Sequence, residues 1–175
     1  ITVFDNVMPT FTFVPANVTV QCNSIPAVGS PMASDGCGGV VGITYNGQSV
    51  SNILCTDKYT LTRQWTATDA CGNTKTATQR IVVTDTQKPV FSSTPANITV
   101  QCDAIPNPAT PSATDNCDTD VAITYNGQTT TSGACPNAYT ITRRWTAADN
   151  CGNTLSVSHR ITVSDNVKPV FTSFP

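Results

Sequence analysis

The sequence contains no glutamate, and its 175 residues include one histidine, His159. All eleven acidic residues are aspartates, and charged residues make up 11% of the chain. A hydrolase needs a nucleophile beside a base, or two carboxylates that face each other across a cleft. The single histidine has no repeated counterpart, glutamate is absent, and the cysteines are expected to be paired, so no candidate nucleophile with a base stands out, and an active site repeated in both copies would be unusual. We therefore predict that the protein is not an enzyme.

Two further absences limit the partners. Lysine and arginine form no cluster, and the formal net charge is −2, so we predict no binding to nucleic acid. No apolar run approaches the roughly 20 residues that a membrane-spanning helix needs, so we predict no membrane insertion. These absences favour a structural or binding role over catalysis, nucleic-acid recognition or residence in a bilayer.

What the sequence does contain is an internal repeat of eighty residues. The run WTATDACGNTKTATQRIVVTDTQKP, residues 65–89, returns as WTAADNCGNTLSVSHRITVSDNVKP, residues 145–169. About half of all positions are identical between the two copies, and no gap is needed to align them. A fixed period of this kind marks tandem domains, so we predict one repeat over residues 7–86 and a second over residues 87–168.

The two ends of the chain extend the same pattern. Residues 1–6 (ITVFDN) resemble the strand that closes each repeat, and residues 169–175 resemble the start of a repeat. We therefore expect residues 1–6 to be the last strand of an upstream repeat and residues 169–175 to begin a downstream one. The chain is then a segment of a longer array.

Alternation with period two predicts an all-β fold. Residues 17–22, 41–45 and 59–68 alternate apolar and polar side chains, and turn residues follow about every ten positions. Asn46-Gly47 carries the signal of a two-residue hairpin. We predict two tandem immunoglobulin-like β-sandwich repeats of about 80 residues, each with about seven strands. An orthogonal barrel remains the structural alternative.

The presumed inward face contains most of the large side chains together with one arginine per repeat. Arg63 and Arg143 fall on this face, where an unpaired charge is costly. We predict a structural role for both. Stacking of the guanidinium on the neighbouring tryptophan is one way to compensate the buried charge. Six aromatic residues are expected on the same inward faces: Trp65, Trp145, Tyr45, Tyr125, Tyr59 and Tyr139.

Each repeat contains four cysteines at fixed spacing, which fits two disulfides in each repeat and an oxidising, extracellular setting. Close Cys-x-x-Cys pairs and histidines at ligand spacing are absent, which disfavours zinc. In an immunoglobulin-like topology, one pair meets at each pole of the sandwich. This places the expected pairs at Cys37–Cys71, Cys22–Cys55, Cys117–Cys151 and Cys102–Cys135. The other two connectivities in each repeat stay open.

Seven of the eleven aspartates stand at repeated positions, in loops or at strand ends. Aspartate is a usual oxygen ligand of calcium, so we predict calcium at the joints between repeats. The candidate ligands at the joint are Asp85, Asp115, Asp149 and Asn153, and those of the equivalent first site are Asp5, Asp35, Asp69 and Asn73. The alternative is that each aspartate caps its own turn.

The WTATDACGN turn and the VPANVTVQC segment at the start of the repeat resemble the hyalin repeat (HYR) family. The resemblance implies extracellular immunoglobulin-like modules, arranged in tandem and linked to adhesion. The segments ITYNGQ, RRWTA and DNCGN resemble the four-cysteine repeats of flavobacterial gliding-motility adhesins. That resemblance implies export by type IX secretion and a position on the bacterial cell surface.

Together these observations predict a stalk or spacer of a large adhesin, stiffened by calcium at its joints. Its expected partners are neighbouring repeats of the same chain, and a surface polysaccharide or substratum. The alternative function is a carbohydrate-binding module of a secreted or cell-surface protein. That alternative needs an exposed aromatic platform, and aromatic residues make up 7% of the chain.

Overall fold

The computed structural model describes residues 4–172 and divides the chain into two units, Ile1–Thr86 and Gln87–Pro175. Residues 1–3 and 173–175 lie outside the described part, so the predicted flanking repeats at residues 1–6 and 169–175 stay predictions. Residues 4–9 belong to no strand. None of the helices in the described part is long and apolar enough to cross a membrane.

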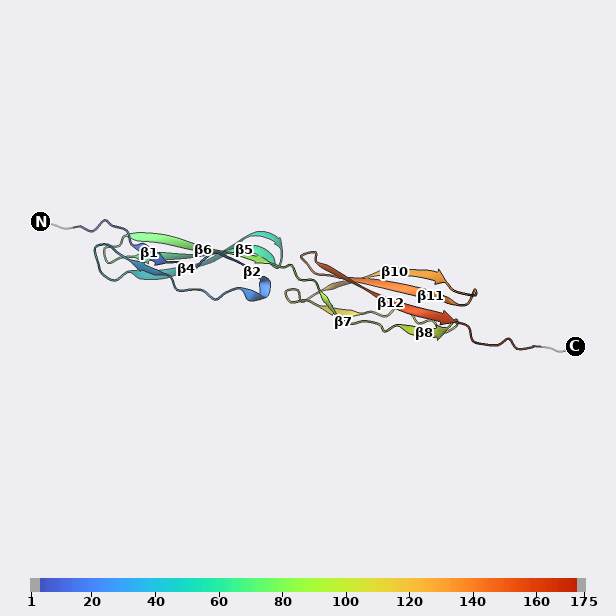
Figure 1. Ribbon diagram of the computed structural model, residues 1–175. Helices are drawn as coiled ribbons and strands as arrows, with labels where there is room; N and C mark the ends of the chain where they lie inside the picture. The colour runs from blue at the N-terminus through green and yellow to red at the C-terminus, as the bar shows by residue number, and fades with distance from the viewer. Residues whose placement is uncertain (1–3, 173–175) are drawn as a thin grey trace. The chain divides into compact units, whose positions relative to one another are not determined.

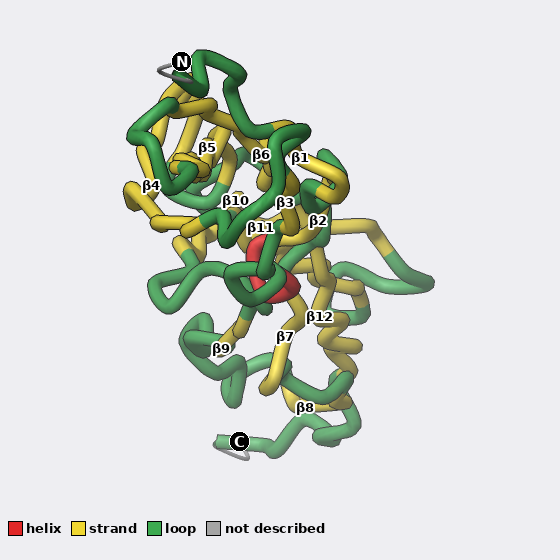
Figure 2. Tube along the Cα trace, turned by 90° about the vertical axis from the view of Figure 1, so that its left-hand side faces the viewer, coloured by secondary structure: helices red, strands yellow, loops and turns green. Residues whose placement is uncertain are grey.

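The first unit consists of six strands and one short 3-10 helix (Figure 1). Its elements are β1 (Thr10–Phe13), β2 (Val18–Gln21), η1 (Cys22–Ser24), β3 (Met32–Ser34), β4 (Gly42–Cys55), β5 (Lys58–Thr68) and β6 (Thr74–Thr84). They form a two-stranded sheet, β1-β3, and a four-stranded sheet in the order β2-β6-β5-β4. In the tube view, η1 is the red segment among yellow strands and green loops (Figure 2).

The second unit repeats this arrangement. Its strands are β7 (Val90–Ser93), β8 (Ile98–Gln101), β9 (Ser112–Thr114), β10 (Ala122–Ser132), β11 (Tyr139–Ala148) and β12 (Thr154–Ser164). The sheets are β7-β9 and β10-β11-β12-β8, which match those of the first unit strand for strand. The predicted fold class, two tandem immunoglobulin-like β-sandwiches, is confirmed, with six described strands in each unit.

The long hairpin β5–β6 is the centre of the first unit. The two strands pair antiparallel without a register shift, from Tyr59 opposite Val83 to Thr68 opposite Thr74. Apolar side chains at every second position therefore reach the same face of the sheet. Leu61, Ile81 and Val83 are at most 4% exposed and form the core cluster.

The predicted hairpin at Asn46-Gly47 is wrong. Strand β4 runs straight through it, and a register shift between Tyr45 and Gly47 marks a β-bulge against β5. Gly47 has a φ of 103°, the left-handed conformation that a bulge glycine adopts at no steric cost. The chain turns back after Cys55, which pairs with Lys58.

Tyr45 and Tyr125 stand opposite Trp65 and Trp145 in the antiparallel ladders, on the same face as expected, but they are less deeply buried. Trp65 and Trp145 are each 2% exposed, whereas Tyr45 and Tyr125 are 39% and 40% exposed. Tyr45 and Tyr125 stand at the bulges, and their rings lie against the tryptophans with centroids 5.7 and 5.3 Å apart. One face of each tyrosine therefore remains accessible to solvent.

Candidate functional site

A buried arginine anchors a loop in each unit. Arg63 is 4% exposed, and its guanidinium donates to the carbonyls of Pro26 (2.7 Å) and Ala27 (2.9 Å). Arg143, also 4% exposed, donates to the carbonyl of Pro106 (2.7 Å). The predicted structural role is therefore explained by backbone carbonyls, because the planar fork of arginine can serve two of them at once.

The Asp-x-Cys-Gly-Asn turn between β5 and β6 is organised by Asp69. Its carboxylate accepts hydrogen bonds from the backbone N–H groups of Cys71 and Asn73, both at 2.9 Å, and from the Asn73 amide at 2.8 Å. The Asn73 side chain, followed by those backbone donors, lowers the pKa of Asp69 against the opposing effect of burial. Asp149 accepts the same three bonds in the second unit, from Cys151 and Asn153.

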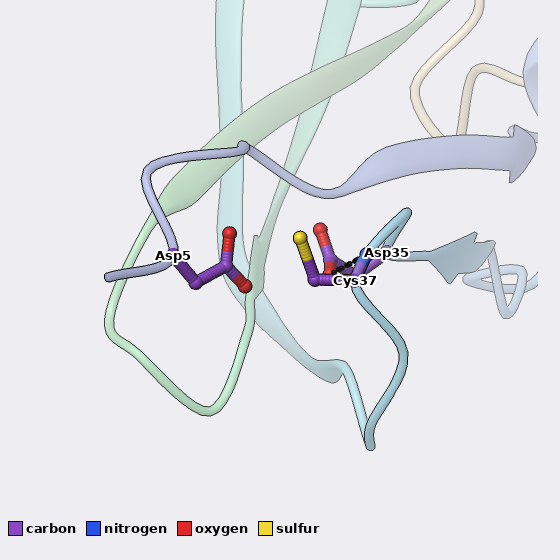
Figure 3. Close-up of side chains that lie close together, drawn as sticks. All are labelled: Asp5, Asp35 and Cys37. Carbon is purple, nitrogen blue, oxygen red and sulfur yellow. Dashed lines mark hydrogen bonds between the residues drawn. The ribbon is translucent and has the colours of Figure 1, made fainter. Parts of the chain in front are cut away.

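Three ligand-bearing side chains meet beside this turn in the first unit (Figure 3). One oxygen each of Asp5 and Asp35 and the sulfur of Cys37 lie within 4.8 Å of one another. Asp35 Oδ2 accepts from the Cys37 N–H at 2.8 Å, whereas Asp35 Oδ1 is buried and has no hydrogen-bond partner among the described residues. The backbone carbonyl of Asp5 accepts from the Asn73 amide at 3.1 Å.

The cluster keeps the Cys37 thiol protonated. A hydrogen bond to Asp5, then burial and the negative charges of Asp5 and Asp35, raise the pKa of Cys37 above 9.0. A protonated thiol is a poor metal ligand and a slow nucleophile. The arrangement therefore favours a hard cation held by carboxylate oxygens over a thiolate-bound metal.

The structure brings together part of the predicted calcium ligand set of the first unit. Asp5 and Asp35 meet, while Asp69 and Asn73 direct their side chains into their own turn. The two carboxylates and the buried Asp35 Oδ1 fit calcium, which takes oxygen ligands, and the thiol does not. Further oxygens would have to come from backbone carbonyls and water.

The second predicted set is distributed over both units. Asp115, Asp149 and Asn153 belong to the second unit and Asp85 to the first, so this set stays a prediction. Within the second unit, Asp115 Oδ1 accepts from the N–H groups of Cys117 (2.8 Å) and Asp118 (3.2 Å).

Asp118 links two loops of the second unit. Its Oδ2 accepts from the N–H of Asn150 at 2.8 Å, and its Oδ1 accepts from the N–H of Asp120 at 2.9 Å. Gly38 stands at the equivalent position of the first copy, so these hydrogen bonds of the Asp118 side chain are specific to the second unit. Because Asp118 is not a repeated residue, its role could not be found by comparing the copies.

The cysteines differ between the units. Cys22 and Cys55 are disulfide-bonded in the first unit, and Cys117 and Cys151 in the second. The other four, Cys37, Cys71, Cys102 and Cys135, are exposed thiols. Each unit thus contains one of its two predicted pairs, and a different one, where two per unit were predicted.

Comparison with known families identifies the second unit. Residues 90–163 match the family described as "HYR-like domain with 4 cysteines". Among curated proteins, the comparison found no match.

Several solved cadherin ectodomains resemble the chain at low identity. Protocadherin gamma B7 domains 1–4 align over 92% of this chain and 52% of their own, with 16% identity and a TM-score of 0.36. Drosophila N-cadherin EC1-4 aligns over 92% and 51%, with 15% identity and a TM-score of 0.34. Human mucin-like protocadherin EC1-2 aligns over 90% and 98%, with 13% identity and a TM-score of 0.33. The chain therefore spans about half the length of the first two.

Proposed function

We propose, given that the second repeat is an HYR-like domain with four cysteines, that this chain is a mechanical module of a large cell-surface adhesin. In this role the two units act as a stalk or spacer that carries tension from one end to the other. The proposal requires each unit to resist force applied through its two ends. Within the four-stranded sheet of each unit, the first strand along the chain pairs with the last, β2 with β6 and β8 with β12, and this pairing supports the proposal.

That pairing is parallel in both units. In the first, β2 pairs with β6 from Val18 opposite Ile81 to Gln21 opposite Thr84. In the second, β8 pairs with β12 from Ile98 opposite Ile161 to Gln101 opposite Ser164. Tension that acts at the start of β2 and at the end of β6 pulls these two parallel strands in opposite directions along their length, and the same holds for β8 and β12. It therefore slides two parallel strands past each other and loads the ladder bonds together.

Side chains extend this parallel ladder beyond its backbone bonds. Asn17 Oδ1 accepts from the N–H of Arg80 at 2.7 Å, one residue before the ladder begins. Thr84 Oγ1 donates to the carbonyl of Val20 at 3.1 Å near its other end. Asn97 and Arg160 repeat the first of these bonds in the second unit, at 2.8 Å.

A proline substitution in β2 tests whether the parallel β2–β6 ladder bears the load. The Val20 carbonyl accepts from Thr84, so the peptide groups of Val20 face β6 and those of Thr19 face away. Val20→Pro removes a donor from the ladder, and we expect it to lower the unfolding force of the first unit in single-molecule stretching. The unaltered second unit in the same chain supplies the reference force.

Two further variants isolate the cause. Thr19→Pro introduces the same ring with its missing N–H on the outer side, and Val20→Ala removes the side chain but keeps the donor. Both should retain more of the unfolding force than Val20→Pro. Equal forces for all three variants would show that the β2–β6 ladder does not bear the load.

Calcium is part of the proposal for the first unit. The neighbouring carboxylates of Asp5 and Asp35 support a cation that neutralises them, and so does Asp35 Oδ1, which is buried without a hydrogen-bond partner among residues 4–172. A ligand present at 100 times its dissociation constant adds about 2.7 kcal/mol to stability. Millimolar calcium should therefore raise the Tm by several degrees over the value in EDTA, and Asp35→Ala should abolish the rise.

Asp103→Ala is the matched control, because Asp103 is exposed and stands outside the cluster. It should leave the calcium effect intact. An identical Tm in calcium and EDTA would show that these aspartates serve only as turn caps. Calcium at the joint, through Asp85, Asp115, Asp149 and Asn153, is the corresponding proposal for the second site.

The finer assignment rests on sequence resemblance. It places the chain in a flavobacterial gliding-motility adhesin, exported by type IX secretion to the bacterial cell surface. Neighbouring repeats of the same chain are its partners there, and the whole adhesin contacts a polysaccharide or substratum. The test is surface labelling of intact cells with an antibody against this chain, before and after the secretion system is disrupted.

The second candidate function is carbohydrate binding. A hollow of about 310 Å³ in the first unit is lined by Tyr45 and Trp65 together with Val28, Gly29, Ser30, Pro31 and Ile43. Tyr45 is 39% exposed and offers a ring on which a sugar can stack. Glycan-array binding that disappears in Tyr45→Ala would establish this function, and uniform absence of binding would exclude it.

A further inference from the structure

The core of the second unit contains the only histidine of the chain. His159 lies on β12 and is 4% exposed. It stands opposite Arg143 of β11, and its ring stacks on Trp145 with centroids 6.4 Å apart at an interplanar angle of 27°. A titratable ring is thus enclosed beside a buried cation.

The equivalent position of the first unit shows what a neutral side chain does there. Gln79 is 5% exposed and stands opposite Arg63. Its amide oxygen accepts from Arg63 Nη1 at 3.4 Å, and its amide nitrogen donates to the Ala16 carbonyl at 2.8 Å. Gln79 therefore joins the buried arginine to the chain that precedes β2.

Replacement of this glutamine by histidine changes the surroundings of the arginine. Arg143 Nε donates to Gln128 of β10 at 3.1 Å and Nη2 to the Pro106 carbonyl. Arg143 Nη1 is buried without a hydrogen-bond partner among the described residues. Arg143 therefore forms fewer hydrogen bonds with β12 than Arg63 forms with the equivalent strand β6.

We propose that His159 makes the second unit acid-labile: protonation of its imidazole places a second positive charge beside buried Arg143 and loosens the unit. Arg143 on β11 is the charged group that faces the ring. The other groups identified around it, Trp145 on the same strand and the Ala96 carbonyl before β8, carry no charge. The first unit, with Gln79 in this position, keeps its stability over the same pH range.

The direction of the effect follows from the proton balance. Burial, followed by the charge of Arg143, lowers the pKa of His159 below 6.5, and the backbone of Ala96 acts in the opposite direction. An unfolded histidine titrates near 6.5, so the unfolded chain binds more protons than the folded one below that pH. Stability is therefore complete above pH 6.5 and is lost as the pH falls toward the folded pKa.

The two-unit chain itself provides the test. Because His159 is the only histidine, its imidazole signal in an NMR titration gives the folded midpoint without assignment ambiguity. Urea unfolding is then followed at pH 7.5 and 5.5 through the amide signals of β6 for the first unit and β12 for the second. We expect the β12 midpoint to fall at pH 5.5 and the β6 midpoint to stay within error.

Two substitutions exchange the histidine and the glutamine between the equivalent positions of the two units. His159→Gln should remove the acid sensitivity of the second unit, and Gln79→His should confer it on the first. A histidine midpoint at or above 6.5 would overturn the proposal. So would a fall of the β12 midpoint that persists in His159→Gln, because another group would then be responsible.

Discussion

At the scale of single residues, the most informative side chains are charged groups inside the sandwich. Arg63 and Arg143 would be costly on an inward face if they lacked partners. The structure supplies backbone carbonyls of the loop before β3 and of its counterpart before β9. The arginine therefore fastens an irregular loop to the sheet. Sequence alone identified the inward position but not the acceptors, because these lie more than thirty residues away.

Arg63→Lys tests this role. Lysine keeps the charge, but its ammonium cannot serve the Pro26 and Ala27 carbonyls with a planar fork. We expect the free energy of unfolding to fall by about 2 kcal/mol, since a buried hydrogen bond to a charged group contributes about 1.5–3 kcal/mol. Urea denaturation of the two-unit chain measures the change.

Arg144→Gln is the control for that measurement. Arg144 is exposed, and glutamine is the residue that the first copy has at this position. Its effect should stay within about 0.5 kcal/mol, as for most surface substitutions. An Arg63→Lys effect of the same small size would contradict the proposed anchoring of the loop.

At the scale of elements, the hairpin β5–β6 was predictable and the course of β4 was not. Strict alternation on both sides of a Gly-containing turn leaves one arrangement that buries Leu61, Ile81 and Val83 together. Asn46-Gly47 has the local signal of a turn, yet Asn46 donates across to Thr66 Oγ1 at 2.7 Å and to Gln64 Oε1 at 3.2 Å. Pairing with β5 therefore outweighs the local preference and converts the turn into a bulge.

The candidate site was likewise predictable only in part. The repeat pattern predicted aspartates in loops, and Asp5 and Asp35 do approach each other beside the turn. Whether an aspartate faces a cation or caps its own turn depends on its side-chain hydrogen bonds. Asp69 is committed to three such bonds. No sequence pattern distinguishes these two orientations.

Gly72→Ala tests the turn that joins β5 to β6. Gly72 has a φ of 88°, and its amide donates to the Asp69 carbonyl at 3.3 Å. An L-residue in this left-handed conformation costs about 1–2 kcal/mol, so we expect a loss of that size in thermal unfolding. Gly36→Ala, which would meet no atom within 4 Å, should be close to neutral.

At the scale of the whole molecule, the two units have equivalent poles with different cysteine states. Cys37 and Cys71 each donate their backbone N–H to an aspartate, at 2.8 and 2.9 Å, and Cys117 and Cys151 do the same. Because the second pair is bonded in this framework, we expect the first to close as well. The same reasoning applies to Cys102 and Cys135, which correspond to bonded Cys22 and Cys55.

Peptide mapping of the chain exported to an oxidising compartment measures this directly. A disulfide-exchanging oxidant, such as oxidised glutathione, would accept the two electrons and two protons released by each pair of thiols. We expect four intramolecular disulfides: Cys22–Cys55, Cys37–Cys71, Cys102–Cys135 and Cys117–Cys151. Persistent thiols at Cys37 and Cys71 would show that the poles of the two units are not equivalent.

The central claim is that each unit bears tension through the parallel pair formed by its first and last sheet strands. The most direct measurement compares two pulling directions on the first unit. Tethers at the two chain ends shear β2 against β6, whereas tethers at the neighbouring residues Asn17 and Arg80 peel the same ladder apart bond by bond. The account predicts a much higher unfolding force for the end tethers, and equal forces in both directions would contradict it.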